Sequence, residues 1–275
     1  MEKSTRIIDV AVLQFDVIAG DIKANIDTVT RLMEDIQADL VVLPELCFSG
    51  YALPDLAAWQ NVSDAAARKA ILSSLTKLAI AHNCLIVAGL SEWVDNKLYN
   101  TAVLVGAEGL IGQHRKMNRT DNEQHFTAGE TLAVHKADNL CLGLPICFDS
   151  WFPESCRILA MQGAEIFCIP ANFGGAWTLD VAKVRALENG IPVVLANRIG
   201  TEIIAGELAT FRGHSLIIDS EGNVLAAAGG EETVLHARVA LNPADRDRAI
   251  ICQNMAKEKA RYHRYIQYHP NPKDD

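Results

Sequence analysis

The chain has 275 residues, of which 49% are hydrophobic and 21% are charged, a composition typical of a globular protein with a sizeable core. Its formal net charge of −9 at pH 7 argues against nucleic acid or an anionic membrane as the main partner. No apolar run reaches the roughly 18 residues that a membrane-spanning helix needs, and the N-terminal segment predicts no export signal.

Apolar runs of strand length recur along the chain, and segments with helical spacing lie between some of them. In the N-terminal half they predict strands at residues 7–15, 40–43, 84–90, 101–105 and 110–113, and helices at 22–36 and 65–81. In the C-terminal half they predict strands at 140–146, 166–169, 193–196, 214–218 and 224–228, and helices after Pro153 and at 181–188. A more polar helix and tail are predicted from about residue 250. Because no repeat or Gly/Ser-rich linker interrupts the series, we expect one mixed α/β domain spanning residues 1–275, with two sheets packed together.

The seven cysteines indicate free thiols rather than a disulfide framework or a zinc site. Their number is odd, no CxxC pair occurs, and several lie inside apolar runs. Free thiols are typical of a reducing compartment, so we expect a cytoplasmic protein.

Polar residues at the ends of predicted strands are candidates for chemistry, because reactive groups of α/β proteins gather there. Glu45 follows the strand at 40–43, where burial would raise its pKa and suit it as a general base. The same pattern also fits a solvated turn residue or a carboxylate paired with a structural cation. Lys116 follows the strand at 110–113, in a basic segment that equally fits a solvated surface turn.

Cys147 lies in the stretch "LPICFDSWFPE", between a predicted buried strand and a helix that begins near Pro153. Helix N-terminal amides after a cysteine lower its pKa and can hold an oxyanion, which favours a nucleophile. A buried, inert core cysteine is the alternative. His125 or His114 could pair with Cys147 as in Cys–His hydrolases, but no signature of that class surrounds it. Asp149 is expected to cap the helix that follows.

Several motifs in one order give the chain a family resemblance. "LPELCFSGY", "HRKMNR" and "GLPICFDSWFPESCRILAMQGAEI" occur in this sequence, with "NEQHFTAGE" before the third and "VRALENGIPVVLANRIG" and "FRGHSLIIDSEGNVLA" after it. Over about residues 6–245 this set resembles the nitrilase superfamily of carbon–nitrogen hydrolases.

The resemblance implies a four-layer α-β-β-α sandwich, paired through its outer helices into a homodimer or a higher even oligomer, with no metal or organic cofactor. It also implies a catalytic triad of Glu45, Lys116 and Cys147. A second glutamate is expected at Glu123, with Glu130 as the nearby competitor. The backbone N–H of Phe148 would help Lys116 to hold the oxyanion.

The residues around Cys147 favour an amide or carbamoyl substrate over a nitrile. Nitrile-cleaving members carry Trp-Glu after the cysteine, whereas this chain has Phe148-Asp149. Some hydrolases of N-carbamoyl amino acids carry two arginines where this chain has Ser150 and Trp151. Candidate pocket walls are Trp151, Asn172 and Phe173.

The leading hypothesis is an amidase that converts small aliphatic carboxamides to carboxylate and ammonia through a thioester. An N-carbamoyl amine hydrolase, which would release amine, carbon dioxide and ammonia, is the alternative. A nitrilase and a non-catalytic binding protein of the same fold are further alternatives.

Overall fold

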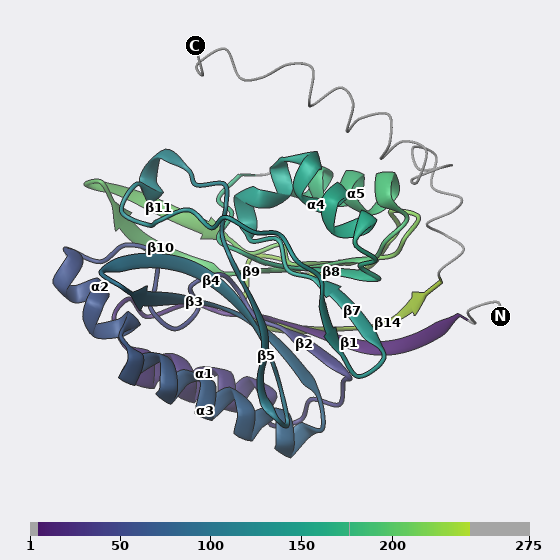
Figure 1. Ribbon diagram of the computed structural model, residues 1–275, viewed down its shortest axis with the longest axis horizontal. Coiled ribbons are helices and arrows are strands. Elements are labelled where there is room, and N and C mark those ends of the chain that lie inside the picture. The colour runs from purple at the N-terminus through teal and green to yellow at the C-terminus, as the bar shows by residue number, and fades with distance from the viewer. Residues whose placement is uncertain (1–4, 176, 243–275) are drawn as a thin grey trace, which may run out of the picture.

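The computed structural model describes residues 5–175 and 177–242. Two six-stranded sheets face each other, and helices cover the outer face of each (Figure 1). This arrangement confirms the expected four-layer α-β-β-α sandwich. The helix and tail predicted from about residue 250 lie outside the described residues. Within these residues, no helix is long and apolar enough to cross a membrane.

The first sheet has the strand order β14-β1-β2-β3-β4-β5. Its strands are β1 (Arg6–Gln14), β2 (Leu40–Val42), β3 (Leu85–Val94), β4 (Lys97–Gly106), β5 (Gly109–Arg115) and β14 (Thr233–Leu241). β1, β2 and β3 are parallel, and β14 closes the edge antiparallel to β1. The last described strand therefore pairs with the first.

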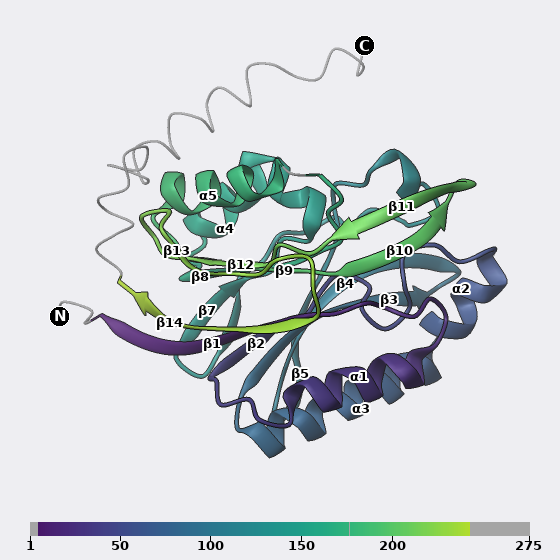
Figure 2. The same ribbon diagram turned by 180° about the vertical axis from the view of Figure 1, so that it is seen from behind.

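The second sheet has the strand order β13-β12-β9-β8-β7-β6. Its strands are β6 (His135–Ala137), β7 (Leu140–Gly143), β8 (Ile166–Ala171), β9 (Val193–Asn197), β12 (Leu216–Ile218) and β13 (Val224–Ala227). A separate hairpin of β10 (Ile199–Ile204) and β11 (Glu207–Arg212) follows β9. In Figure 2 this hairpin extends away from β9 and β12, on the same side of the molecule as α2.

Alternation along β1 shows how the layers are held together. Val10 and Val12 belong to the core between the two sheets, whereas Ala11 and Leu13 belong to the core beneath the helices of the first sheet. Successive side chains of a strand point to opposite faces, so a strand buried on both sides is apolar at every position. This explains the continuous apolar run in the sequence.

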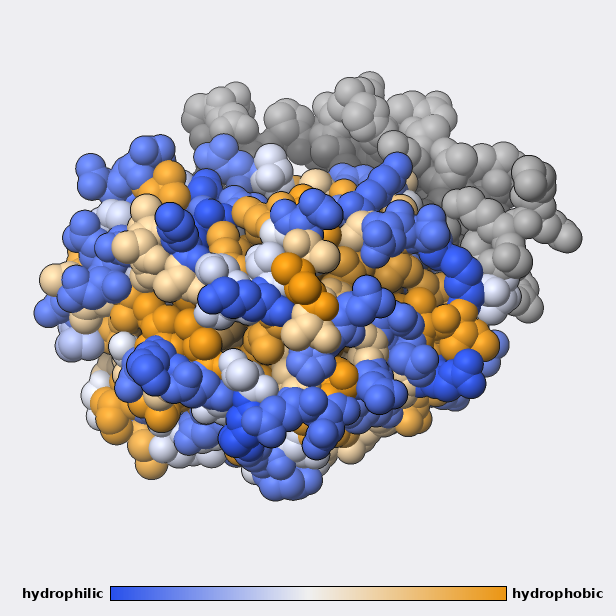
Figure 3. Space-filling model, turned by 90° about the horizontal axis from the view of Figure 1, so that it is seen from below, coloured by the Kyte–Doolittle hydropathy of each residue, from blue (hydrophilic) through white to orange (hydrophobic). Residues whose placement is uncertain are grey.

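Helices α1 (Ile22–Met33) and α3 (Ala65–His82) cover the first sheet, with α2 (Leu56–Ser63) beside them. The side chains of Asp21, Asp55 and Asp64 accept hydrogen bonds from the first-turn amides of α1, α2 and α3 respectively, as N-caps do. Figure 3 shows the face over α1 and α3, where hydrophilic side chains dominate and hydrophobic ones appear in smaller groups. Helices α4 (Pro153–Met161) and α5 (Thr178–Asn189) cover the second sheet.

Several elements differ from the sequence prediction for identifiable reasons. β7 ends at Gly143 rather than at residue 146, because Pro145 has no N–H for a strand ladder. β3 and β4 are longer than predicted and join through Asp95 and Asn96, which both have positive φ and form a tight hairpin turn. The prediction did not include α2, β6, β10, β11 and β14.

Candidate active site

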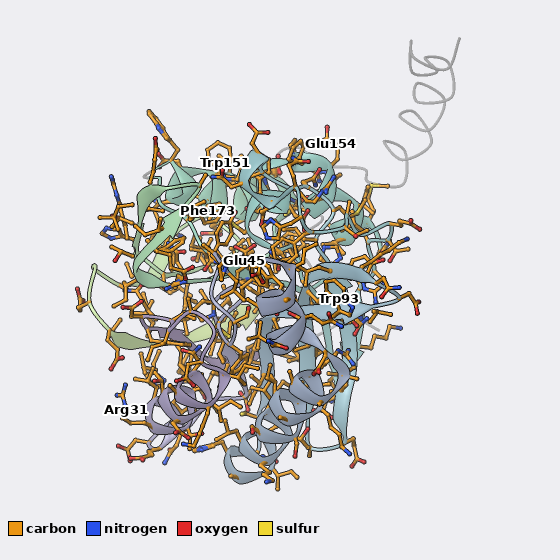
Figure 4. The ribbon with its side chains drawn as sticks, turned by 90° about the vertical axis from the view of Figure 1, so that its left-hand side faces the viewer. Arg31, Glu45, Trp93, Trp151, Glu154 and Phe173 are labelled. Atoms are coloured by element: carbon orange, nitrogen blue, oxygen red, sulfur yellow. The ribbon has the colours of Figure 1, made fainter. Side chains whose placement is uncertain are left out.

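Glu45 lies just beyond the carboxyl end of β2, in a loop held against β3. The Gly89 N–H donates to the Pro44 carbonyl at 3.1 Å, and the Cys47 N–H donates to the Gly89 carbonyl at 3.0 Å. A Cβ at Gly89 would lie 2.5 Å from the Glu45 Cα, so only glycine permits this approach. The Glu45 side chain is fully buried, and Figure 4 shows it near the centre of the molecule.

The other three candidates reach the same place from two connections, Lys116 and Glu123 from the one after β5 and Cys147 from the one after β7. Lys116 directly follows β5, and Glu123 ends a short 3₁₀ helix, η1 (Asp121–Glu123). Cys147 begins a second one, η2 (Cys147–Trp151), and has a φ of 43°. A positive φ is costly for a non-glycine residue and is found at strained functional turns.

Lys116 connects the two glutamates. Its Nζ donates to Glu45 Oε1 and to Glu123 Oε1, both at 2.7 Å. Glu123 is held in turn through its other oxygen, which accepts the Thr120 N–H at 2.8 Å. Asn100 Nδ2 also donates to Glu45 Oε1, at 2.7 Å. Glu130 is exposed, so the structure brings Glu123 rather than Glu130 to the site.

Burial and charge determine the protonation of the lysine and its partner. Burial alone would lower the pKa of Lys116, but its acidic neighbours Glu45, Cys147 and Glu123 together raise that pKa well above its ordinary value. The lysine is therefore a fixed cation. Burial raises the pKa of Glu45, with a further increase from Glu123, and Lys116 offsets only part of it.

The Cys147 thiol is neutral at rest and lies beside an available base. Burial and the charge of Glu45 raise the pKa of Cys147 well above its ordinary value, although Lys116 and the Asn172 backbone N–H act in the opposite direction. The thiol interacts with the Glu45 carboxyl group and lowers its pKa. Glu45 Oε2 accepts no hydrogen bond of standard geometry within the described part of the chain. This oxygen can therefore take the thiol proton.

Asp149 binds the loops around Cys147 and Lys116 to each other and does not cap α4 as predicted. The N-cap position of α4 is Phe152, with Pro153 starting the helix. Asp149 Oδ1 accepts the N–H groups of Met117 and Asn118 at 3.1 and 2.7 Å. Its Oδ2 accepts the Ile146 N–H and contacts His114 Nε2 at 3.0 Å. One buried carboxylate thus sets the spacing of the two loops.

Neither histidine considered as a partner for Cys147 takes that role. His114 pairs with Asp149, and His125 stacks on Trp59 and Phe126 with ring centroids 5.3 and 4.5 Å away. No group of three His, Cys, Asp or Glu side chains within residues 5–175 and 177–242 is arranged to hold a metal ion.

The predicted pocket residues differ in their surroundings. Asn172 is 8% exposed, and neither amide atom of its side chain has a hydrogen-bond partner within the described chain. Phe173 is buried and fixed by Asn197, which accepts its N–H at 2.7 Å. Trp151 is 38% exposed, and its ring lies 6.2 Å from that of Phe148. In Figure 4 Phe173 lies between Glu45 and Trp151, in the direction of the outer surface.

The sequence analysis did not identify Asn100 as a residue of this site, and it assigned Asp149 a different role, that of a helix cap. Both are buried; Asn100 contacts Glu45, and Asp149 accepts N–H groups of residues adjacent in sequence to Lys116 and Cys147. Asn100 lies within a strand, in "LYNTAV", and its distance in sequence from the other candidates gives no local signal.

Known proteins of related function match this chain over most of its length. Residues 9–249 match the carbon–nitrogen hydrolase family. A probable nitrilase of Schizosaccharomyces pombe is 31% identical over 77% of this chain and 80% of its own length. An N-carbamoylputrescine amidase of Solanum lycopersicum is 30% identical over 88% of this chain and 89% of its own length. For a 2-oxoglutaramate amidase of Bacillus subtilis the identity is 33%, over 84% and 90% respectively.

Solved structures share the fold. The carbon–nitrogen hydrolase from Helicobacter pylori G27 has a TM-score of 0.81 and 26% identity, and the match covers 92% of this chain and 96% of that one. A mutant of the amidase from Nesterenkonia sp. AN1 has a TM-score of 0.78 and 26% identity, with 93% and 99% covered. That structure shows the result of Michael addition of acrylamide at the active site cysteine.

Proposed function

The chain belongs to the carbon–nitrogen hydrolase family, and from this premise we propose that it is an amidase of small aliphatic carboxamides that works through a thioester on Cys147. The observation that carries the proposal is the buried cluster around Lys116. The ammonium lies 2.7 Å from both Glu45 Oε1 and Glu123 Oε1, Glu45 Oε2 has no hydrogen-bond partner within the described chain, and the Glu45 carboxyl group interacts with the Cys147 thiol.

In the first half-reaction, Glu45 acts as general base. Its Oε2 accepts the thiol proton, and the sulfur attacks the carbonyl carbon of the amide. Negative charge then develops on the carbonyl oxygen, where the Lys116 ammonium and the Phe148 N–H stabilise it. In comparable sites the loss of one such donor costs about 2.7–4 kcal/mol of barrier. Phe148 suits this role because the first amides of a helix have no partner inside the helix.

In the second half-reaction, the C–N bond breaks and the nitrogen leaves as ammonia with the proton from Glu45. A water molecule takes the place of the ammonia. Glu45 removes one of its protons, and the resulting attack on the thioester releases the carboxylate and restores the thiol. Glu123 helps to keep the Lys116 ammonium in place throughout, because its Oε1 accepts a second hydrogen bond from Nζ.

Asn172 supports a primary amide as the substrate. Its buried carboxamide has both a donor and an acceptor without a described partner, and buried polar groups are normally satisfied. A second carboxamide is the complement of this pair, because its N–H₂ and C=O can meet both atoms. The amidase names among the relatives and the acrylamide bound by the Nesterenkonia amidase agree with this substrate class.

A second candidate is an N-carbamoyl amine. It is favoured by the N-carbamoylputrescine amidase of Solanum lycopersicum, which matches over 88% of this chain. The terminal carbamoyl group presents the same N–H₂ and C=O to Asn172. Its thioester is a thiocarbamate-type adduct whose breakdown releases carbon dioxide, so the two candidates differ in products.

The test is intact-protein mass spectrometry after incubation with small amides, N-carbamoyl amines and nitriles, with ammonia and carbon dioxide assayed in parallel. We expect an acyl adduct and ammonia without carbon dioxide for the favoured amide. Cys147→Ala is expected to lose both adduct and turnover. Cys156→Ala removes an equally buried thiol on α4 and is expected to keep both.

Release of carbon dioxide with the adduct would move the assignment to the N-carbamoyl amine hydrolase. Adduct formation only with nitriles would identify a nitrilase. Turnover that survives in Cys147→Ala would overturn the thioester mechanism itself.

A further inference from the structure

The Asn100 side chain lies between the two carboxylates of the site, and the mechanism above gives it no role. Asn100 is 1% exposed and belongs to β4. Its Nδ2 donates to Glu45 Oε1 at 2.7 Å and lies 3.3 Å from Glu123 Oε1. One neutral amide therefore bridges both carboxylates, which also share the Lys116 ammonium.

We propose that Asn100 is a positioning residue that commits Glu45 Oε1 to hydrogen bonds and so leaves Oε2 as the oxygen that receives the Cys147 proton. This inference rests on the proposed role of Glu45 as the base. Two donors, Lys116 Nζ and Asn100 Nδ2, converge on Oε1, each at 2.7 Å. A carboxylate held at one oxygen by two donors has its rotation restricted, so its other oxygen is the one left without a hydrogen bond in a carboxyl group that interacts with the thiol.

The backbone of Asn100 also helps to position the residues of the site. Its carbonyl accepts the Lys116 N–H at 2.8 Å, and it pairs with Ser91 on β3. The residue thus fixes the backbone of the cation and, through its side chain, the carboxylates on either side of that cation. A change in the side chain alone leaves the backbone contact in place, which makes the two contributions separable.

The charge balance of the site explains why a neutral donor is suited to this position. The charged and titratable groups that face Glu45 are Lys116, Glu123, Cys147 and Tyr51. With both glutamates ionised, one ammonium faces two carboxylates, so the buried site carries excess negative charge. An amide donor stabilises both anions and has no proton to exchange with them, unlike lysine or histidine.

Packing alone does not account for an asparagine here. Its Oδ1 is buried and has no hydrogen-bond partner within the described chain, which is unfavourable in a protein interior. A leucine has the same number of side-chain heavy atoms and would carry no such penalty. The amide donor is therefore the property that the position uses.

The test is the pH dependence of Cys147 alkylation by iodoacetamide, followed by intact mass, in the wild type and in Asn100→Leu. Loss of the donor destabilises the ionised form of Glu45, so we expect the acid limb of the alkylation profile to move to higher pH. With a good amide substrate, kcat at neutral pH is expected to fall about tenfold while KM changes by less than about twofold. Asn100→Asp, which adds a third carboxylate, is expected to move the limb further.

Thr101→Val is the matched control. Thr101 is the next residue of β4, is fully buried, and donates its hydroxyl to the Glu92 carboxylate at 3.2 Å, away from the site. It should leave the acid limb unchanged. If Asn100→Leu does not fold, Asn100→Ser takes its place. The serine side chain is polar but too short to bridge the carboxylates, so the acid limb is expected to move in the same direction.

An unshifted limb in a folded Asn100→Leu or Asn100→Ser variant would overturn the inference. Alkylation does not require turnover, so this result is independent of whether the chain hydrolyses amides. Persistence of the acid limb in Glu45→Gln would instead refute Glu45 as the base. Failure of the Asn100 inference and failure of the proposed mechanism therefore give different results.

Discussion

Lys116 is a cation whose surroundings fix both its charge and its place. It is 2% exposed and lies 2.7 Å from each of two carboxylates, and its acidic neighbours together more than offset the effect of burial on its pKa. A lysine in this state does not act as a proton donor near neutral pH. It serves as a permanent electrostatic partner for negative charge on the substrate oxygen.

Cys147 and Glu45 depend on each other at rest. Burial raises the pKa of both, and the charge of Lys116 acts in the opposite direction on both. Their titration belongs to the group as a whole rather than to either residue. The nucleophile is therefore generated only when the proton moves from sulfur to carboxylate.

The pH dependence of activity follows from the raised pKa of Glu45. The base must be ionised, so kcat/KM is expected to be lost as the pH falls through that pKa, with an acid limb above the ordinary glutamate value of about 4.3. In Lys116→Met the lowering effect of the cation on Glu45 is gone, and the limb should move to still higher pH. The measurement is kcat/KM against pH for the wild type and Cys147 alkylation against pH for the variant.

Lys97→Met, at an exposed position at the start of β4, is the control and should leave the profile unchanged. An acid limb at or below the ordinary glutamate value would contradict the role assigned to Glu45.

At the scale of elements, the site is a meeting of loops whose spacing is set by close backbone contacts. β3 and the loop after β2 touch at Gly89, and Asp149 connects the loop after β5 with the loop after β7. These loops carry Glu45, Lys116 and Cys147 at or near the contacts. The packing of the strand ends therefore determines the positions of the reacting groups.

Gly89→Ala tests the first of these contacts. The new Cβ would lie 2.5 Å from the Glu45 Cα, so the loop after β2 must shift. We expect a loss of about 1–3 kcal/mol in the free energy of unfolding, measured in urea. Displacement of the base by about an ångström is expected to lower kcat roughly 100-fold.

Gly230→Ala provides the comparison, because its Cβ would meet its nearest atom, the Arg212 carbonyl oxygen, at an ordinary 3.6 Å. Wild-type kcat in Gly89→Ala would show that the backbone approach at β3 does not position Glu45.

At the scale of the whole molecule, the two outer layers differ in character. The layer of α1 and α3 exposes Ile80 at 59% among mostly hydrophilic side chains, whereas α4 and α5 expose Ile158, Val184 and Leu187 at 41%, 47% and 45%. Exposed apolar side chains that gather on one layer are typical of an association surface. The resemblance implies pairing through outer helices, and we propose that α4 and α5 are the helices through which two copies pair.

This association is tested by analytical ultracentrifugation of the wild type and of the double variant Ile158→Glu with Val184→Glu. The added charges would be buried without partners in such an interface, so the variant is expected to sediment as a monomer. Ile203→Glu, at a 60% exposed position of the β10–β11 hairpin, should sediment as the wild type does. A monomeric wild type would contradict the proposal.

Local sequence patterns were sufficient to predict most of the strands and helices that form the layers. Continuous apolar runs identified the strands buried on both faces, such as β1 and β8, and the 3.6-residue spacing identified α1 and α3. The hairpin of β10 and β11 was missed because its strands are half-exposed and lack such a run. β14 was missed for the same reason: it forms an edge strand with alternating exposure.

The sequence by itself determined the kinds of side chain available, the loops that carry them and, through ordered motifs, the family to which the chain belongs. Only the tertiary structure decided that Glu123 rather than Glu130 reaches Lys116, that Asp149 binds two loops instead of capping α4, and that Asn100 bridges both carboxylates. The reason is that local periodicity depends on neighbours a few residues apart. The site joins positions 45, 100, 116, 123 and 147, and their distances are set by strand order and backbone contacts across the whole chain.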